Sequence, residues 1–395
     1  MLGVGSVPAT GVAAVVLNLT AVNATTDTFV TKWPSGNLRP NASALNPRPG
    51  GAYPNLVVAQ VGQGGRISLY NEAGYVDVLA DVVGYYPADR FGNRLWVHGL
   101  GSTELDMATG VAVDGLGNAF VVGDTRGTLP ASSGVSGWAN VFLAKYSPAG
   151  ELLWVRQVGT DAGEQASGVA VDPRGDIVIT GFSERALPGS VEANRGGSDV
   201  FVAKFDTSGQ QLWVRQLGSD QNDAPGGITT DPSGDILVVG RTAGLMDGAP
   251  EGRAGSYDGF VARLDPAGNR RWIHQFGAVP WDVASDVAVG PSGEVYVTGS
   301  MDGVPEIWEV FPASYNTFLA AYGPEGNRRW QTSLGTGYLD MSQAVAVDAL
   351  SRVFIVGSTG GTLPGSPDLN TSSASSGLRL LDGFVAMYRT WPTAG

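Results

Sequence analysis

The sequence contains no cysteine, which excludes disulfide bonds, thiolate metal sites and a cysteine nucleophile. Its 395 residues include only 24 Lys and Arg against 37 Asp and Glu, so the net charge is −13. A chain this acidic lacks the basic face that nucleic acids and anionic membrane surfaces require. No run of 18 apolar residues is present to span a bilayer. We therefore expect neither a nucleic-acid partner nor membrane insertion.

The motifs of common enzymes are also missing. There is no Gly-x-Ser-x-Gly elbow, no His-Glu-x-x-His pair and no glycine loop of the kind that holds phosphates. The two histidines, His98 and His274, occupy the same position of the repeat described below, so they are interpreted as surface variants of one site. No catalytic residue is expected, and the protein is predicted not to be an enzyme.

What the chain does contain is glycine, 58 residues, and a repeated pattern of short strands. The unit is clearest in 212–260, where three β-branched, apolar runs are separated by Gly, Pro, Asp and Ser clusters typical of turns. A tryptophan opens each copy at steps of 58, 59, 59 and 58 residues, and these are Trp96, Trp154, Trp213, Trp272 and Trp330. This regularity predicts that the five tryptophans pack between copies.

A fixed period with four short strands per copy favours a β-propeller. Five strands of each kind can be counted from Leu95 onward, provided that the first tryptophan strand joins the last three strands. We therefore predict an all-β fold with a five-bladed propeller in 89–395. The strand Leu95–Leu100 would close the ring beside Phe384–Tyr388, leaving no open edge.

The repeat resembles a bacterial β-propeller repeat family known as SBBP. The resemblance rests on AVDPRGD (170–176), on Val-x-Gly at the end of the second strand and on DVFVAK (199–204), and it extends over 95–388. It implies an extracellular or cell-surface propeller. It does not imply an activity, because one fold serves many functions.

Residues 1–88 lack the repeat and read as five or six antiparallel strands, which predicts a small β-sandwich domain. The runs VPATGVAAVVLNLTAVN (7–23), WPSG (33–36) and ADVVGYY (80–86) resemble an accessory module of secreted bacterial proteins. Members of that family usually carry one or two further strands upstream. The resemblance therefore implies either a truncated N-terminus or a sheet edge completed by another chain, through which the protein could assemble.

The turn between the first and second strands carries an aspartate, the hairpin acid, in four of the copies, and a glycine such as Gly175 or Gly234 is expected to end the turn. These acids are Asp114, Asp172, Asp231 and Asp348, with Gly290 at this position in the fourth copy.

Five further carboxylates recur eight residues before the position of the hairpin acid: Asp106, Glu164, Asp223, Asp282 and Asp340. They lie in the loops that enter each copy, which in propellers open near the central channel. One hypothesis is a ring that binds a hard cation such as calcium, the one cofactor considered. The alternative is that each carboxylate accepts backbone N–H groups of its own loop. A feature present in every copy favours the structural alternative.

Aromatic residues that break the repeat are the candidate ligand-binding residues, because Trp and Tyr give large contact area at low entropic cost. They stand in entry loops or in the long loops between the second and third strands: Trp281, Tyr338, Trp138, Tyr257, Trp308, Phe311 and Tyr315. Both sets of loops open on one face of a propeller. The alternative is that these aromatics pack the loops onto the blades.

Three functions remain open at this point. The first is a secreted or surface-attached binding protein whose propeller face recognises a glycan or a protein. The second is a structural subunit of a multi-chain assembly joined through the first domain. The third is a glycan-active hydrolase or lyase, for which Asp282 and Glu306 are the least implausible carboxylate pair.

Overall fold

The computed structural model describes residues 12–40, 43–62, 66–87, 95–132, 137–249, 256–277, 281–302, 315–336, 338–365 and 381–389. The chain forms two compact units, Met1–Val97 and His98–Gly395, whereas the sequence placed the domain boundary at 88/89. In the described part of the chain, no helix has the length and apolar character needed to cross a membrane.

The described residues of the first unit form two antiparallel sheets. Its larger sheet has the order β3-β1-β5 and its smaller one pairs β2 with β4. The strands are β1 (Val12–Val22), β2 (Val30–Pro34), β3 (Tyr53–Gln60), β4 (Ile67–Asn71) and β5 (Asp77–Pro87). Alternate residues of β1, including Val15, Leu17 and Leu19, are fully buried, as the two-residue period of a strand requires. With Val30 from the smaller sheet and Leu45, they form the core of this unit.

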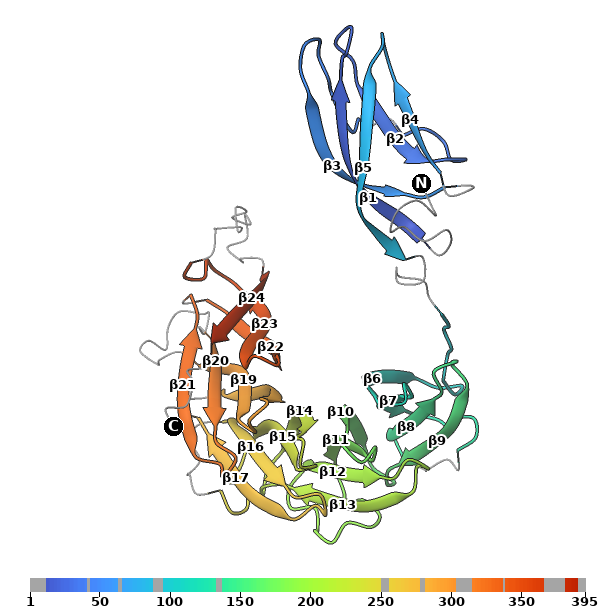
Figure 1. Cartoon of the computed structure of the whole chain (residues 1–395). Helices are drawn as coiled ribbons and strands as arrows, with labels where there is room; N and C mark the ends of the chain where they lie inside the picture. The colour runs from blue at the N-terminus through green and yellow to red at the C-terminus, as the bar shows by residue number, and fades with distance from the viewer. Residues whose placement is uncertain are drawn as a thin grey trace, which may run out of the picture. The chain divides into compact units, whose positions relative to one another are not determined.

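The second unit is a series of antiparallel sheets, each built from strands in chain order (Figure 1). We call them blades 1 to 5. Blade 1 is β6 (Asp106–Val113), β7 (Ala119–Thr125), β8 (Asn140–Tyr146) and β9 (Leu152–Val158); blade 2 is β10 (Glu164–Val171), β11 (Ile177–Ser183), β12 (Asp199–Phe205) and β13 (Gln211–Leu217); blade 3 is β14 (Asp223–Thr230), β15 (Ile236–Thr242), β16 (Asp258–Leu264) and β17 (Arg270–Phe276); blade 4 is β18 (Val283–Val289), β19 (Val295–Asp302), β20 (Tyr315–Tyr322) and β21 (Arg328–Leu334); blade 5 is β22 (Asp340–Val347), β23 (Arg352–Thr359) and β24 (Asp382–Arg389).

The first strands of successive blades pack side by side, and the fourth strands lie on the outer side (Figure 1). A Cβ on Gly168 of β10 would lie only 3.1 Å from Ile228 of β14, so glycine permits the close approach of neighbouring inner strands. Between the blades lie separate apolar cores. The third strands β8, β12 and β16 are buried along their whole length, because both of their faces are covered. The predicted all-β, propeller-like repeat is confirmed.

Three of the repeat tryptophans link one blade to the next. The indole N–H groups of Trp154, Trp213 and Trp272 donate to backbone oxygens of Thr207, Pro266 and Pro324, at 3.3, 3.2 and 3.0 Å. Each acceptor lies in the turn between the third and fourth strands of the following blade. The three tryptophans therefore pack between blades, as their regular spacing predicted.

The closing strand predicted at Leu95–Leu100 is not observed. These residues form no strand, and the described residues of blade 5 form three strands. As a result β24 is alternately half-buried and exposed, and Val385 is 71% exposed. The matching residues Val202 and Val261 are fully buried. Pairing with β24 would depend on contacts almost 300 residues apart in the chain, whereas every other blade is built from neighbouring strands.

Candidate functional site

The recurring carboxylates begin the first strand of each blade or immediately precede it. Asp223 accepts hydrogen bonds from Ser219 N at 2.7 Å and from the Ser219 hydroxyl at 3.0 Å. Glu164 accepts from Thr160 N at 2.9 Å, from the Thr160 hydroxyl at 2.6 Å and from the Ser183 hydroxyl at 3.0 Å. Glu164 thus joins its entry loop to the end of the second strand of its own blade.

The same pattern holds for Asp106, which accepts from Ser102 and Thr125, and for Asp340, which accepts from Thr336 and Thr359. Asp282 is fully buried at the equivalent position. Among the described residues no three His, Cys, Asp or Glu side chains gather as a metal site would require. The hydrogen bonds of Asp106, Glu164, Asp223 and Asp340 therefore support the structural alternative. The calcium hypothesis stays a prediction.

At two junctions between blades, an aspartate that begins the third strand of one blade lies close to the recurring carboxylate of the next blade. A Cβ on Gly277 would lie 2.7 Å from both Asp258 Oδ1 and Asp282 Oδ2, so the two oxygens converge on one glycine. At the junction of blades 2 and 3, Asp199 borders Gly218 in the same way. Burial raises the pKa of Asp199, and burial together with the Asp199 charge raises the pKa of Asp223 to about 6. Asparagine replaces the first partner at the other two junctions, as Asn140 and Asn316.

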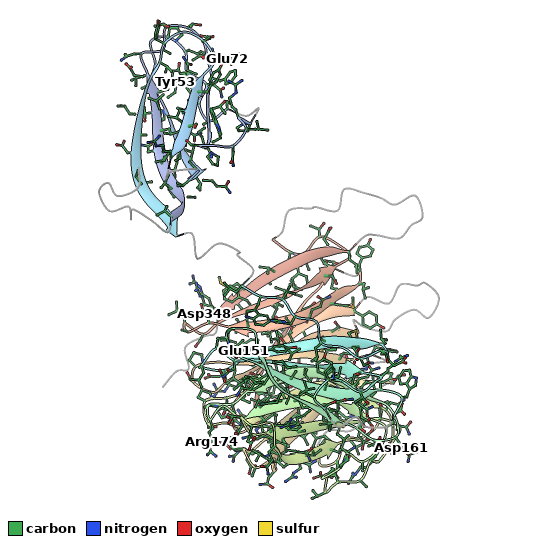
Figure 2. All side chains as sticks on the ribbon, turned by 90° about the vertical axis from the view of Figure 1, so that its right-hand side faces the viewer. Tyr53, Glu72, Glu151, Asp161, Arg174 and Asp348 are labelled. Carbon is green, nitrogen blue, oxygen red and sulfur yellow. The ribbon has the colours of Figure 1, made fainter. Side chains whose placement is uncertain are left out.

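The hairpin acids lie in turns on the face opposite the entry loops. Asp172 Oδ1 accepts from Arg174 N and Asp176 N at 2.8 and 3.0 Å, and Gly175 ends the turn with φ +87°. Figure 2 shows Arg174 toward one side of the second unit and Asp161, in an entry loop, toward the other. The turn chemistry predicted for the hairpins is thus present, and the entry loops lie away from them.

Two of the candidate aromatics are in contact on the entry-loop face. The ring centroids of Tyr257 and Trp281 are 4.7 Å apart, and the two residues form a parallel β-bridge. The guanidinium carbon of Arg241 lies 5.4 Å from the centroid of Tyr257. Trp281 is 42% exposed. These three side chains form a continuous ladder, which we call the 241–257–281 ladder.

The other candidates are spread over different blades. Trp138, 60% exposed, lies under Arg126 at 4.3 Å in blade 1. Tyr338 packs on Gly360 and Gly361 at the entry to blade 5. Tyr315 begins β20 and is half-buried. Trp308 and Phe311, together with Glu306 of the hypothetical enzymatic pair, lie outside the described residues.

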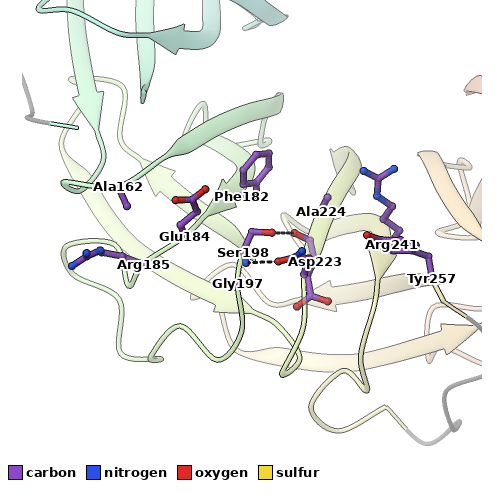
Figure 3. A pocket seen from close by; sticks show the side chains of 11 residues that line it. Ala162, Phe182, Glu184, Arg185, Gly197, Ser198, Asp223, Ala224, Arg241 and Tyr257 are labelled. Carbon is purple, nitrogen blue, oxygen red and sulfur yellow. Dashed lines mark hydrogen bonds between the residues drawn. The ribbon is translucent and has the colours of Figure 1, made fainter. Parts of the chain in front are cut away.

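A cavity of about 640 Å³ lies beside the ladder at the junction of blades 2 and 3 (Figure 3). Blade 2 contributes Phe182, Glu184 and Arg185 to its lining, and blade 3 contributes Asn222, Asp223, Arg241 and Tyr257. Three hydrogen bonds join the blades at this cavity. Ser198 N donates to Asn222 Oδ1 and the Ser198 hydroxyl donates to Asp223 O, both at 3.2 Å, and Asp223 N donates to Ser198 O at 2.7 Å. The lining offers a cation, acceptors and an aromatic face, the combination typical of polar-ligand sites.

Sequence reasoning selected Tyr257 and Trp281 but missed Arg241, Glu184 and Phe182. A signal existed for two of these residues. Arg241 and Phe182 occupy the same position of the repeat, directly after the second-strand glycine, where the other blades have Asp or Ser. Their departure from the repeat marks this junction.

Comparison with known proteins identifies the repeat itself. Residues 212–245 match the family described as SBBP, a beta-propeller repeat. This match and the series of four-stranded sheets define the second unit as a β-propeller-type repeat domain.

Two curated relatives are much longer than this chain. It is 27% identical over 193 residues to the regulatory protein FlaEY of Caulobacter vibrioides, covering 46% of this chain and 20% of the relative. It is 24% identical over 357 residues to an uncharacterised WD repeat-containing protein of Acanthamoeba polyphaga mimivirus, covering 68% and 26%. The chain thus spans about a fifth to a quarter of these relatives.

Solved structures with a similar course of the chain are distant. A putative gluconolactonase is 13% identical, with TM-score 0.32 and coverage of 63% of this chain and 70% of that one. An inactive virginiamycin B lyase from Staphylococcus aureus is 12% identical, with TM-score 0.32 and coverage of 72% and 88%. A gluconolactonase from Xanthomonas campestris is 12% identical, with TM-score 0.31 and coverage of 67% and 83%.

Proposed function

We propose that this protein is a non-catalytic, extracellular or cell-surface binding protein whose entry-loop face recognises a glycan or a protein ligand. The observation that carries the proposal is the 241–257–281 ladder beside the cavity between blades 2 and 3. The exposed ring of Trp281 and the half-buried ring of Tyr257 lie next to polar groups, an arrangement suited to stacking on sugar rings or to anchoring a partner.

The engagement of the buried acids favours binding over catalysis. Glu164, Asp223 and Asp340 are at most 1% exposed, and loop N–H and hydroxyl groups of their own blades donate to them. A catalytic acid or base must reach the proton it transfers. These carboxylates instead hold their loops in place, and the exposed groups at the cavity are those that bind.

We also propose that the five blades close into a ring through Leu95–Leu100 and β24. The rings of His98 and Tyr146 are stacked at 6.3 Å, as those of His274 and Tyr322 are at 5.8 Å in an interior pair of blades. Leu100 packs on the apolar cluster of blade 1. His98 and Leu100 thus pack on blade 1 as the outer strand of a preceding blade would. The edge of β24 lacks a partner strand among the described residues.

Replacing Val385 with Lys tests the closure. In a closed ring Val385 is buried like Val202, and the charge costs several kcal/mol of unfolding free energy, about 3 or more. Without closure Val385 is 71% exposed and the change is nearly neutral. Val191, 77% exposed in a loop, provides the control as Val191→Lys. Equal stability of the two variants would refute a closed ring.

Binding itself is tested on a broad array of glycans, with Trp281→Ala and the matched variant Trp138→Ala. We expect Trp281→Ala to abolish a bound signal while the thermal midpoint is unchanged, because the side chain is exposed. Trp138→Ala, in blade 1, should retain the signal. Turnover of a bound glycan would contradict the non-catalytic proposal.

A second candidate function is supported by the first unit. The sheet β3-β1-β5 exposes Leu56, Val58, Leu79 and Val83. Exposed apolar patches of this kind mark interaction surfaces. The corresponding proposal is a structural subunit that assembles through this domain. Light scattering of the wild type and of Leu56→Lys decides it, since only an assembly through this face would lose mass with the substitution.

A further inference from the structure

Arg241 occupies a repeat position at which the side chains of the other blades are acidic or uncharged. It follows the second-strand glycine, where the other four blades carry Asp124, Phe182, Ser300 and Ser358. The alternating pattern of the strand places this residue toward the same side in each blade. A cation therefore occurs at this position in blade 3 alone.

Arg241 lacks an acidic partner in the described part of the chain. It is exposed, and its guanidinium packs against the ring of Tyr257. Arg185 across the cavity is neutralised by Asp161 at 3.4 Å. In a chain with net charge −13, an arginine held over an aromatic ring and left without a carboxylate is available to a ligand anion.

The remaining lining matches a polar ring better than an extended peptide. Glu184 and Asn222 are exposed and can accept hydrogen bonds from hydroxyl groups. Phe182 and Tyr257 are half-buried and supply apolar faces on both sides (Figure 3). A sugar ring carries hydroxyl donors around its rim and an apolar face, so each of these groups has a partner on it.

We propose that the cavity between blades 2 and 3 binds a carboxylate-bearing sugar, with the carboxylate on Arg241 and the ring over Tyr257. The inference rests on the proposed binding function and adds the chemical class of the ligand. Glu184 and Asn222 accept from the sugar hydroxyl groups, and Trp281 extends the stacking surface toward blade 4. The planar guanidinium suits bidentate contact with a carboxylate.

The test uses the full chain and an array of galacturonate, glucuronate, mannuronate and sialylated oligosaccharides, each beside a neutral or methyl-esterified parent. We expect the charged member of at least one pair to bind, and its methyl ester to bind about tenfold or more weakly. Arg241→Gln should weaken the charged ligand by a similar factor and leave the ester unchanged. Arg126→Gln, which removes another arginine stacked on an exposed tryptophan, is the control and should have no effect.

The outcomes separate the two proposals. Binding of neutral and charged members with equal strength, unaffected by Arg241→Gln, would overturn the carboxylate inference and leave glycan binding standing. Binding of an acidic hexapeptide as tightly as of the sugars would overturn the sugar class. A blank array, with folding verified by the thermal midpoint, would overturn the carboxylate inference and the glycan arm of the proposed function.

Discussion

The indole N–H of Trp213 donates to the carbonyl oxygen of Pro266 in the next blade, 3.2 Å away. Against the indole lies Gly268, with φ +82°, where a Cβ would come within 3.0 Å of the ring. Arg215 adds a hydrogen bond to Gly268 O at 3.0 Å. One aromatic side chain and one turn thus hold this part of the junction between blades 2 and 3.

Replacing Trp213 with Ala should lower the free energy of unfolding by about 2–4 kcal/mol, because the ring is half-buried and its removal leaves a void. Trp213→Phe should cost only about 1 kcal/mol, since it keeps most of the packing and loses the hydrogen bond. Denaturation by urea measures both values. The exposed Trp281→Ala is the control, and an equal effect of the two alanine variants would disprove the inter-blade role of Trp213.

Lys204 should contribute strongly to the stability of the folded protein. Its ammonium lies 2.7 Å from Asp172 Oδ2 and 3.2 Å from Asp176 Oδ2 in a buried position. Lys204→Ala leaves a buried carboxylate without its cation and should cost about 3–5 kcal/mol, as measured by urea denaturation. Blade 4 lacks both partners, with Gly290 and Ala321 at the equivalent positions.

A double variant provides the control. Lys204→Ala with Asp172→Asn should be more stable than Lys204→Ala alone, because it removes the stranded charge and keeps an oxygen acceptor for Arg174 N and Asp176 N. A double variant less stable than the single one would show that the ion pair is not what makes Lys204 important.

Asp199→Asn should stabilise the protein at neutral pH. The pKa of Asp223 is raised from 3.8 to about 6, so the folded state keeps a proton that the unfolded state releases. Binding of this proton therefore stabilises the folded state. The contribution is fully present below about pH 4 and is lost as the pH rises through 6, where the folded state also releases the proton. Burial is the main cause of the raised pKa of Asp223, and the charge of Asp199 is the smallest one. Asparagine at position 199 removes that charge and also removes a carboxylate whose own pKa is raised by burial, so the loss should shrink.

The expected gain is about 1 kcal/mol at pH 7.5 and smaller at pH 4, read from thermal midpoints at the two values. Asn140 and Asn316 show that asparagine fits this position in other blades. Asp220→Asn, at an exposed site nearby, should leave the pH profile unchanged. A gain for Asp199→Asn that is equal at both pH values would argue against charge repulsion as its cause.

Removal of metal should leave stability unchanged. Asp340 is fully buried and already accepts from Thr336 N at 2.7 Å and from the Thr336 hydroxyl at 2.9 Å. Asp340→Ala should therefore cost about 1–3 kcal/mol with or without calcium. Thermal midpoints in chelator and in calcium provide the measurement. A rise of the midpoint with calcium that Asp340→Ala abolishes would restore the hypothesis of a cation ring.

Strand positions in the second unit could be predicted from sequence because each strand is specified locally. Runs of apolar, β-branched residues mark β15 and β16, and glycines such as Gly234 with φ +85° mark the turns between strands. Periodicity also identified the tryptophans as packing residues. The predicted closing strand was not observed. Pairing of Leu95–Leu100 with β24 has no local determinant in the sequence, so the sequence could not specify it.

The candidate site was harder to predict. The period of the carboxylates could be read, but which N–H groups donate to Asp223 follows from loop conformation, not from spacing. Tyr257 and Trp281 were selected separately as irregular aromatics, and their contact arises from a parallel bridge between two blades. Arg241 escaped notice because a single charged residue on a strand carries no signal until its neighbours are known.

The hydrogen bonds of Trp154, Trp213 and Trp272 all run in one direction, from one blade to the turn of the blade that follows. An interior blade of this series donates its indole N–H to the next blade and accepts, on a turn carbonyl, the indole N–H of the preceding blade. The addition or loss of a whole copy therefore preserves the tryptophan contacts at the junctions without a compensating substitution, whereas a partial copy would leave an indole or a turn unmatched.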